Sequence, residues 1–509
     1  GDASCRCMTE IVMSIERMKN MKKDQKPNIV FILADDLGYG DLSCQGAELV
    51  HTPNIDRLAE EGIRFTDAHS PSSVCTPSRY NLLTGRYCWR TWAKTGCIWI
   101  HDPMVIDDGR MTIASLLRDN GYTTGLVGKW HLGFGRPGSE EWDDMSGINL
   151  NGRIDPGPCE AGFDYFYGVP AVGQEPNVYI ENHHVVGLEE DDPIELALDP
   201  DPAYIAEYYR RPRTRNPKIK MKGGQATKFE FNELAEHLTA KAGDYIREKA
   251  GGDRPFFLYF AQRNVHTPLI PHPRFEQTSE IGVYGDFINE LDWSVGEIIK
   301  TLEEQNILDE TLIFFSSDNG ATEMHRPVTH VNYNGHRANG PLRGQKSEVF
   351  EGGHRVPFIA RWPGRITAGS TSDRLIALTD MLATFASLVG AELPDSAGGD
   401  SFDMLPALLG ENGPGQIRSC CVHDSMRCGM FAMRSGEWKL ILGRGGGGIG
   451  SGWGTAPGIE KFSASDPVFQ LYNLETDVAE ENNCVEKYPD IAKRLVSELE
   501  TVRAEGRSR

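Results

Sequence analysis

The sequence contains no hydrophobic stretch long enough to cross a membrane. The longest apolar run near the N-terminus extends only from Ile29 to Ala34, whereas a membrane-spanning helix needs about 20 apolar residues. Residues 1–26 carry charge throughout and lack the apolar centre of a signal peptide. We therefore expect no membrane partner, and a tail over residues 1–26 that is disordered or foreign to the natural chain. Either a signal peptide has been removed, the start is artificial, or the protein is intracellular.

Positive charge is also scarce. The 509 residues include 52 Lys and Arg against 73 Asp and Glu, which gives a formal net charge of −21. This excess of negative charge argues against binding to nucleic acid and disfavours long-range attraction of any polyanion. Cysteine is scarce as well, since 11 in a chain of this length are too few for a disulfide framework. An anionic substrate would need a local group of cations, and the cysteines leave the compartment open.

Four short apolar segments end abruptly in polar residues. Continuous apolar runs without alternation indicate strands of a sheet buried on both faces, and they cover residues 28–34, 122–127, 256–261 and 311–315. Helical patterns lie between them at residues 54–62, 112–120, 235–249 and 284–304. This order predicts an α/β fold with a large, doubly wound, mostly parallel central sheet. We assign residues 27–395 to this domain.

Two further regions differ from this pattern. Residues 135–224 read as insertions and loops, with an acidic run at 189–192 and a basic run at 210–222 that could attract an anionic polymer. Glycine and proline accumulate at 398–415, which indicates a boundary. Beyond it, strands of a small antiparallel sheet are predicted at 431–434, 438–442 and 469–474, and a closing helix at 490–503. We assign residues 396–509 to a smaller C-terminal α+β subdomain.

Polar side chains follow two of the apolar strands at the point where each strand ends. Asp35 and Asp36 follow the first strand, and Asp318 and Asn319 follow the last. Ligands of doubly wound sheets collect at the carboxyl ends of the strands, so we expect these oxygen donors to meet there. An all-oxygen set favours Ca²⁺ or Mg²⁺ over zinc, and three neighbouring carboxylates would repel one another without a cation. Taken singly, both segments are also ordinary turn sequences.

A cysteine lies four residues before an arginine in the segment from Ser73 to Arg79. A helix that opens after Pro77 turns Arg79 back toward Cys75, and a helix start stabilises a nucleophile or a bound anion there. A buried structural cysteine beside a surface arginine is the plainer interpretation of this spacing when it is taken alone.

Further cations and proton carriers follow other predicted strands. Lys129 and His131 alternate, so in an extended loop they point to the same side. His266 precedes a Thr-Pro pair at a strand terminus, and Lys346 lies farther along the chain. The chain contains 14 histidines, so position rather than residue type has to select the functional ones.

Together these segments resemble the motifs of the type I sulfatases, the formylglycine-dependent, arylsulfatase-like family of the alkaline phosphatase superfamily. The resemblance begins with Cys-Thr-Pro-Ser-Arg at 75–79 and Leu-Leu-Thr-Gly-Arg at 82–86. It continues in the segments 34–38, 128–133, 266–268, 317–320, 335–346 and 351–358. These occur in the family's order, and the resemblance extends from Pro27 to Asn483. Gln345 departs from it, because related sequences commonly carry glycine there.

The resemblance implies a sulfuric ester hydrolase with an alkaline phosphatase-like fold. A formylglycine-generating enzyme would convert Cys75 to formylglycine, and one hydroxyl of its hydrate would attack the sulfur of a sulfate ester. Ca²⁺, with Mg²⁺ as the alternative, would be held by the converted Cys75 together with Asp35, Asp36, Asp318 and Asn319. A periplasmic or secreted location also follows from the resemblance.

Roles for the remaining site residues come from the same resemblance. Arg79 would hold the hydrate, with Lys129 beside it. His266 and Lys346 would donate to the departing alcohol oxygen. His131 would take the proton of the second hydroxyl, which releases sulfate.

Two other functions stay open at this point. One is a phosphonate monoester or phosphodiester hydrolase of the same superfamily, although such relatives tend to carry histidine where this chain has Asn319. The other is a non-catalytic binder of sulfated glycans. We expect a sulfated carbohydrate as substrate, because a large chain with many insertions can build an extended pocket. His336 and Arg337 are candidates for binding it, and Trp89, Arg90 and residues 92–99 form either a sugar-stacking rim or ordinary packing.

Overall fold

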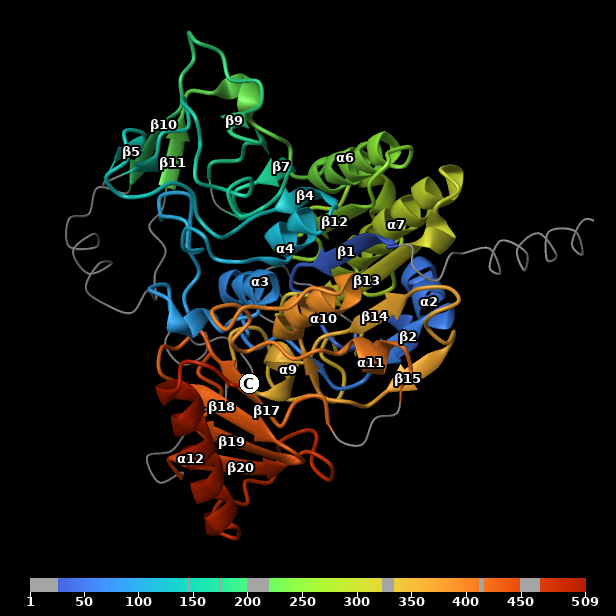
Figure 1. Ribbon diagram of the computed structural model, residues 1–509, viewed down its shortest axis with the longest axis vertical. Coiled ribbons are helices and arrows are strands. Elements are labelled where there is room, and N and C mark those ends of the chain that lie inside the picture. The colour runs from blue at the N-terminus through green and yellow to red at the C-terminus, as the bar shows by residue number, and fades with distance from the viewer. Residues whose placement is uncertain are drawn as a thin grey trace, which may run out of the picture.

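The computed structural model describes residues 26–143, 146–173, 175–198, 219–322, 334–411, 416–448 and 467–509 (Figure 1). Residues 1–25 of the expected tail and residues 210–218 of the basic run lie outside the described residues. No helix of the described ranges is both long and apolar enough to cross a membrane.

A ten-stranded sheet forms the centre of the larger part of the molecule. Its five middle strands, β13, β1, β12, β4 and β7, run parallel, and antiparallel pairings flank them on both sides. In sheet order the strands are β15 (Ser370–Ser372), β2 (Ile63–Phe65), β14 (Phe358–Arg361), β13 (Thr311–Ser317), β1 (Asn28–Ala34), β12 (Phe256–Ala261), β4 (Thr123–Lys129), β7 (Tyr165–Val169), β8 (Ile180–Glu181) and β9 (His184–Val185). The predicted doubly wound, mostly parallel sheet is confirmed.

Both faces of this sheet are covered by helices, which explains why its middle strands are continuously apolar. In β1, Ile29 and Phe31 belong to one hydrophobic cluster, while the alternating Val30 and Ile32 belong to the other. The first cluster packs under α3 (Cys75–Thr84), α4 (Ile113–Asp119) and α10 (Met381–Val389), and the second under α2 (Pro53–Glu60), α6 (Leu234–Lys249) and α7 (Val283–Glu304). The four helices predicted between the strands match α2, α4, α6 and α7 closely.

The insertions and connections contain short elements. They are β3 (Ala68–His69) paired with β16 (Ile376–Ala377), β5 (Trp142–Asp143) with β6 (Gly147–Ile148), β10 (Glu195–Leu198) with β11 (Ile219–Lys222), and the short helices η2 (Cys88–Arg90), α9 (Glu351–His354) and α11 (Leu405–Leu408).

A four-stranded antiparallel sheet follows near the C-terminus and packs against one long helix (Figure 1). The sheet contains β17 (Cys420–Asp424), β18 (Phe431–Ser435), β19 (Trp438–Leu442) and β20 (Phe469–Asn473), and the helix is α12 (Pro489–Ala504). The last three strands and the helix agree with the sequence prediction, whereas β17 is not predicted. Its residues are all buried and include two cysteines, a histidine and an aspartate, so neither polarity alternation nor an apolar run marks it. The domain limits 27–395 and 396–509 stay a prediction.

Candidate active site

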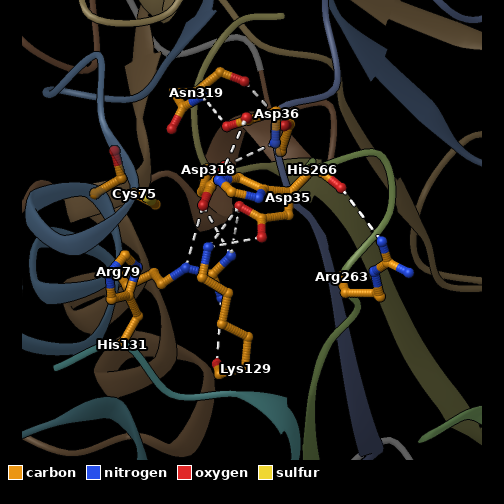
Figure 2. Close-up of polar contacts among 12 residues, drawn as sticks. Asp35, Asp36, Cys75, Arg79, Lys129, His131, Arg263, His266, Asp318 and Asn319 are labelled. Carbon is orange, nitrogen blue, oxygen red and sulfur yellow. Dashed lines mark hydrogen bonds and ion pairs between the residues drawn. The ribbon is translucent and has the colours of Figure 1, made fainter. Parts of the chain in front are cut away.

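The carboxyl ends of four parallel strands meet at one edge of the central sheet. Asp35 and Asp36 directly follow β1, Asp318 and Asn319 directly follow β13, Lys129 ends β4, and His266 lies a few residues beyond β12. Figure 2 shows their side chains gathered beside the helix that carries Cys75 and Arg79. Oxygens of the three aspartates lie within 4.8 Å of one another, and all three residues are buried. The convergence expected from the strand pattern is therefore present.

Three cations approach these carboxylates. Lys129 Nζ lies 2.7 Å from Asp35, and Lys346 Nζ lies 2.6 Å from Asp36. Arg79 donates to Asp318 at 2.8 Å and lies 3.3 Å from Asp35. We call Asp35, Asp36, Asp318 and Asn319, together with Arg79, Lys129 and Lys346, the strand-end cluster. It balances three carboxylates against three cations inside the protein, where charges need such pairing.

The pKa values of Asp35, Asp318 and Lys346 depart from their ordinary values, because these charged groups are buried close together. Burial alone would raise the pKa of Asp35, but Lys129, His266 and Arg79 hold it well below its usual range. Burial and the charge of Asp35 raise the pKa of Asp318 well above its ordinary value. Burial would lower the pKa of Lys346, whereas Asp36 and Cys75 raise it, so this lysine stays charged. A bound cation would relieve the repulsion among the carboxylates.

The donor atoms of the cluster fit a hard divalent ion. Asn319 Nδ2 donates to Asp36 at 2.8 Å, which fixes the amide so that its Oδ1 is available. That Oδ1 is buried and has no hydrogen-bond partner among the described residues. Three carboxylates and an unpaired amide oxygen form an all-oxygen set, which suits Ca²⁺ or Mg²⁺ rather than zinc.

Cys75 is the first residue of helix α3 and is buried. The helix therefore begins three residues earlier than expected, because Pro77 is tolerated in a first turn, where backbone N–H groups have no helical partner. Cys75 Sγ lies 4.0 Å from Cys97 Sγ. Its hydrogen bond with Cys97, together with Lys129 and Lys346, lowers the pKa of the Cys75 thiol well below its usual value despite burial. The site thus favours negative charge at residue 75.

His131 reaches the same space from the loop after β4. Its carbonyl accepts a hydrogen bond from Thr76 Oγ1 at 2.9 Å, which ties this loop to helix α3. Neither ring nitrogen has a hydrogen-bond partner among the described residues, and burial lowers the pKa of the ring to about 4. His131 is therefore a neutral imidazole with a nitrogen free to accept a proton.

His266 has one ring nitrogen fixed by the backbone. Its Nδ1 lies 2.7 Å from the carbonyl oxygen of Thr267, and because a carbonyl can only accept, Nδ1 carries the proton. The other nitrogen, Nε2, faces Asp36 at 3.7 Å. Burial, together with the charge of Lys346, lowers the pKa of the His266 ring. A neutral ring with its proton on Nδ1 directs the Nε2 lone pair toward the Asp36 carboxylate, and a cation between the two groups would relieve this contact.

The two residues proposed for substrate binding lie in different surroundings. His336 is buried, and its Nε2 lies 2.8 Å from Asp41, which also accepts from Tyr284 at 2.6 Å. Arg337 is exposed. His336 thus takes part in an internal hydrogen-bond network, and only Arg337 projects toward solvent.

The tryptophans near the Cys75 segment also differ in their exposure to solvent. Trp89 is 9% exposed and stacks on Tyr87 with ring centroids 5.6 Å apart, whereas Trp92 is 42% exposed. Trp99 contributes a ring 5.2 Å from that of His131. Trp89 is therefore largely packed against its neighbours, whereas Trp92 is exposed.

Sequence reasoning missed Cys97. This residue follows no motif, and its contact with Cys75 across 22 residues depends on how the loop after η2 returns to the head of α3. No local pattern in the sequence marks such a return.

Comparisons with known proteins agree with these observations. The family model described as "Sulfatase" matches residues 27–391. An N-acetylgalactosamine-6-O-sulfatase of Bacteroides thetaiotaomicron is 37% identical over 507 residues, which cover 95% of this chain and 94% of the relative. The N-acetylgalactosamine-6-sulfatase of Canis lupus familiaris is 34% identical, with 84% of this chain and 74% of that protein covered.

A solved structure supports the same relationship. It is a Bacteroides thetaiotaomicron sulfatase described in connection with the metabolism of multiple glycosaminoglycans. It matches with a TM-score of 0.81 and 36% identity, covering 94% of this chain and all of that chain.

Proposed function

The chain belongs to the sulfatase family, whose members are sulfuric ester hydrolases, and we propose that it removes 6-O-sulfate from N-acetylgalactosamine residues of a sulfated glycan. The observation that carries the reaction type is the position of Cys75 at the head of α3, beside the strand-end cluster. The substrate class is supported by the near full-length similarity to N-acetylgalactosamine-6-O-sulfatase.

In this proposal Cys75 is the precursor of the nucleophile. Conversion to formylglycine by a formylglycine-generating enzyme would supply an aldehyde hydrate whose hydroxyl attacks sulfur. An all-oxygen site does not favour a thiolate, so an unmodified Cys75 would be a poor partner for a hard cation. Asp35, Asp36, Asp318 and Asn319 would hold Ca²⁺, or Mg²⁺, which would supply positive charge toward the sulfate oxygens. Family membership supports a periplasmic or secreted location.

The chain's own cations would then hold residue 75 and assist the departing alcohol. Arg79 and Lys129, fixed against Asp318 and Asp35, would hold residue 75 in place. Lys346 would donate to the alcohol oxygen as it leaves. Because these groups are already fixed by ion pairs, they need little reorganisation when charge develops, which is the main source of electrostatic catalysis.

Two histidines would move the protons. His266, whose Nδ1–H is committed to the backbone, would present Nε2 as the donor to the departing alcohol. His131, neutral and with both ring nitrogens buried and free of partners in the described residues, would accept the proton from residue 75 when sulfate is released. A sugar alcohol is a poor leaving group, so a protonated donor contributes substantially to the rate.

A panel of substrates combined with mass measurement tests the proposal. We expect hydrolysis of N-acetylgalactosamine 6-sulfate and of 6-sulfated oligosaccharides to exceed that of the 4-sulfated isomers and of a small aryl sulfate. The peptide containing residue 75 should have the mass of the aldehyde or its hydrate. Cys75→Ala should abolish turnover, and Cys428→Ser, at an exposed cysteine, should not.

Two results would contradict the proposal in different ways. Exclusive activity on the aryl sulfate would reject the glycan substrate while leaving the sulfatase reaction intact. An unmodified thiol at residue 75 in a fully active preparation would reject the formylglycine nucleophile.

A further inference from the structure

A cavity lies between the α/β part of the molecule and the C-terminal helix α12. Its volume is about 720 Å³, and its lining comes from the segment 86–95 on one side and from residues 428–431 and 500–506 on the other. None of the residues assigned above to nucleophile, metal or proton transfer lines it. We call it the cationic cavity, defined by Arg86, Trp89, Arg90, Lys94, Phe431, Glu500 and Arg503.

Positive charge dominates this lining, in contrast to the chain as a whole. Four basic residues face one acidic residue, Glu500, whereas the whole chain carries a net charge of −21. Arg90 is neutralised internally, because it donates to both oxygens of the buried Asp400 at 2.8 and 3.0 Å. The other three basic residues therefore supply the local positive charge.

Those three side chains are not engaged by carboxylates. Within the described ranges Arg86, Lys94 and Arg503 form no ion pair. Arg86 donates instead to the hydroxyl of Tyr80 and to the carbonyl of Arg90, both at 3.3 Å. The protein as a whole has an excess of acidic residues. Three cations that line one cavity and have no carboxylate partner among the described residues therefore favour the binding of an external anion.

Two aromatic rings, those of Trp89 and Phe431, contribute apolar surface to the lining of the cavity. The Arg90 guanidinium lies 4.2 Å from the centroid of Trp89, and Trp89 meets Phe431 edge to face with centroids 5.4 Å apart. Arg503 lies 5.4 Å from the Phe431 ring. Rings surrounded by cations suit a ligand with an apolar face and negatively charged substituents, which describes a sulfated or carboxylated sugar.

The cavity also lies close to the proposed nucleophile along the chain. Thr95, in its lining, is two residues from Cys97, whose Sγ is 4.0 Å from Cys75 Sγ. Two residues span at most about 7 Å. One glycan chain could therefore occupy the reaction site and the cationic cavity at the same time.

We infer that the cationic cavity binds anionic sugar units of the glycan beyond the unit that loses its sulfate. The inference rests on the proposed function, since it takes the same sulfated polymer as ligand. It also gives the C-terminal helix a role, because Arg503 of α12 contributes one of the three available cations. Local cations are needed, because long-range electrostatics repel a polyanion from this chain.

Binding without turnover tests the inference. In a Cys75→Ala background, calorimetry with a 6-sulfated chondroitin hexasaccharide should show about tenfold weaker affinity after the double change Lys94→Gln and Arg503→Gln, since two exposed charge contacts with the ligand would be lost. The matched control is Lys300→Gln with Lys493→Gln, two exposed lysines outside the cavity, the second also on α12. This control should leave the affinity unchanged.

Kinetics with substrates of two lengths provide the second readout. With Cys75 intact, the Lys94→Gln/Arg503→Gln variant should raise KM for the hexasaccharide about tenfold and leave KM for N-acetylgalactosamine 6-sulfate unchanged. Equal affinities in the two double variants, or an equal rise of KM for both substrates, would overturn the inference. Failure of the proposed function would show differently, as wild-type protein that binds the hexasaccharide without releasing sulfate.

Discussion

Two buried clusters of carboxylates and cations lie in this molecule. Both compensate the charge of buried carboxylates, but they do so with different arrangements of the cations. One is the strand-end cluster at the carboxyl ends of the central strands. The other, which we call the histidine cluster, contains His69, His354 and His423 with Asp67, Glu351, Glu480, Arg355 and Lys439. It lies where β3, α9 and the C-terminal sheet meet, and its three histidines are fully buried.

The carboxylates of the histidine cluster are paired by its own cations, although His423 Nε2 has no hydrogen-bond partner among the described residues. Lys439 Nζ lies 2.9 Å from Glu351 and 2.8 Å from Glu480, so one ammonium separates two carboxylates. His69 lies 2.8 Å from Asp67 and 3.1 Å from His354. Burial lowers the pKa of all three histidines, which keeps them neutral. This cluster ties the C-terminal sheet to the α/β part of the molecule.

The cations of the strand-end cluster are arranged differently. Its carboxylates converge, its cations approach from the periphery, and the amide oxygen of Asn319 is left without a partner in the part of the chain that the structure describes. A divalent ion there would give the cluster a net positive charge that favours a sulfate group. The contrast indicates that a permanent lysine between carboxylates serves stability, whereas carboxylates left facing one another serve binding.

The largest expected effect concerns stability and the histidine cluster. Lys439→Met should lower the free energy of unfolding by about 3–5 kcal/mol, because removing one partner leaves Glu351 and Glu480 buried without their shared cation. Chemical denaturation measures this change, and Lys493→Met, at a lysine that is 80% exposed, is the control. Wild-type stability in Lys439→Met would mean that this cluster does not hold the fold together.

The converse experiment removes a cation of the strand-end cluster. Lys346→Met should reduce kcat/KM by roughly 10²–10³-fold, because a fixed donor for developing negative charge is lost. It should also lower the unfolding free energy, because the buried Asp36 loses a cation that lies 2.6 Å away. Steady-state kinetics on the sulfated substrate, paired with denaturation, separate the two effects. Equal slowing of turnover by Lys346→Met and by the control Lys493→Met would contradict a catalytic role for Lys346.

A cation should stabilise only through the strand-end cluster. Adding Ca²⁺ at 100 times its Kd to chelator-treated protein should raise the unfolding free energy by about 2.7 kcal/mol. Asp318→Asn should remove this gain, whereas His354→Gln in the histidine cluster should preserve it. Thermal unfolding with and without Ca²⁺ provides the readout, and a gain that survives in Asp318→Asn would place the ion elsewhere.

The smallest effect, measured over one pH unit, concerns Asp424, next to His423. Burial raises the pKa of Asp424 to about 8, far above the value of about 3.9 expected in the unfolded chain. The folded state therefore binds the proton of Asp424 more tightly than the unfolded chain does. Between about pH 4 and pH 8 the unfolded chain loses this proton first, so the free energy of unfolding falls as the pH rises through this range. Between pH 6.5 and 7.5 the loss should approach 1.4 kcal/mol.

A substitution isolates this contribution. Asp424→Asn should flatten the pH dependence of the unfolding free energy over that interval relative to wild type, and Asp477→Asn, at a residue outside both clusters, should not. Parallel curves for wild type and Asp424→Asn would show that Asp424 is already ionised in the folded protein.

Local sequence patterns were sufficient for much of the fold and for the core of the site. β1 and β12 have the predicted bounds, since runs such as Phe-Phe-Leu-Tyr-Phe-Ala have no polar face and suit only a strand covered on both sides. Asp35, Asp36, Asp318 and Asn319 directly follow two such strands, and parallel strands bring their carboxyl ends to one edge. The position of the proposed metal site follows from these two facts.

Only the tertiary structure decided what each buried polar group contacts. Cys97 meets Cys75, His336 turns to Asp41, and the bond from Ser72 to Asp424 joins residues 352 positions apart. The periodicity of a sequence records which side of a helix or strand is covered, but it does not record what covers it. Packing between distant segments decides the role of each basic residue. Lys439 is buried between two carboxylates in the histidine cluster, whereas Lys94 and Arg503 line the cationic cavity.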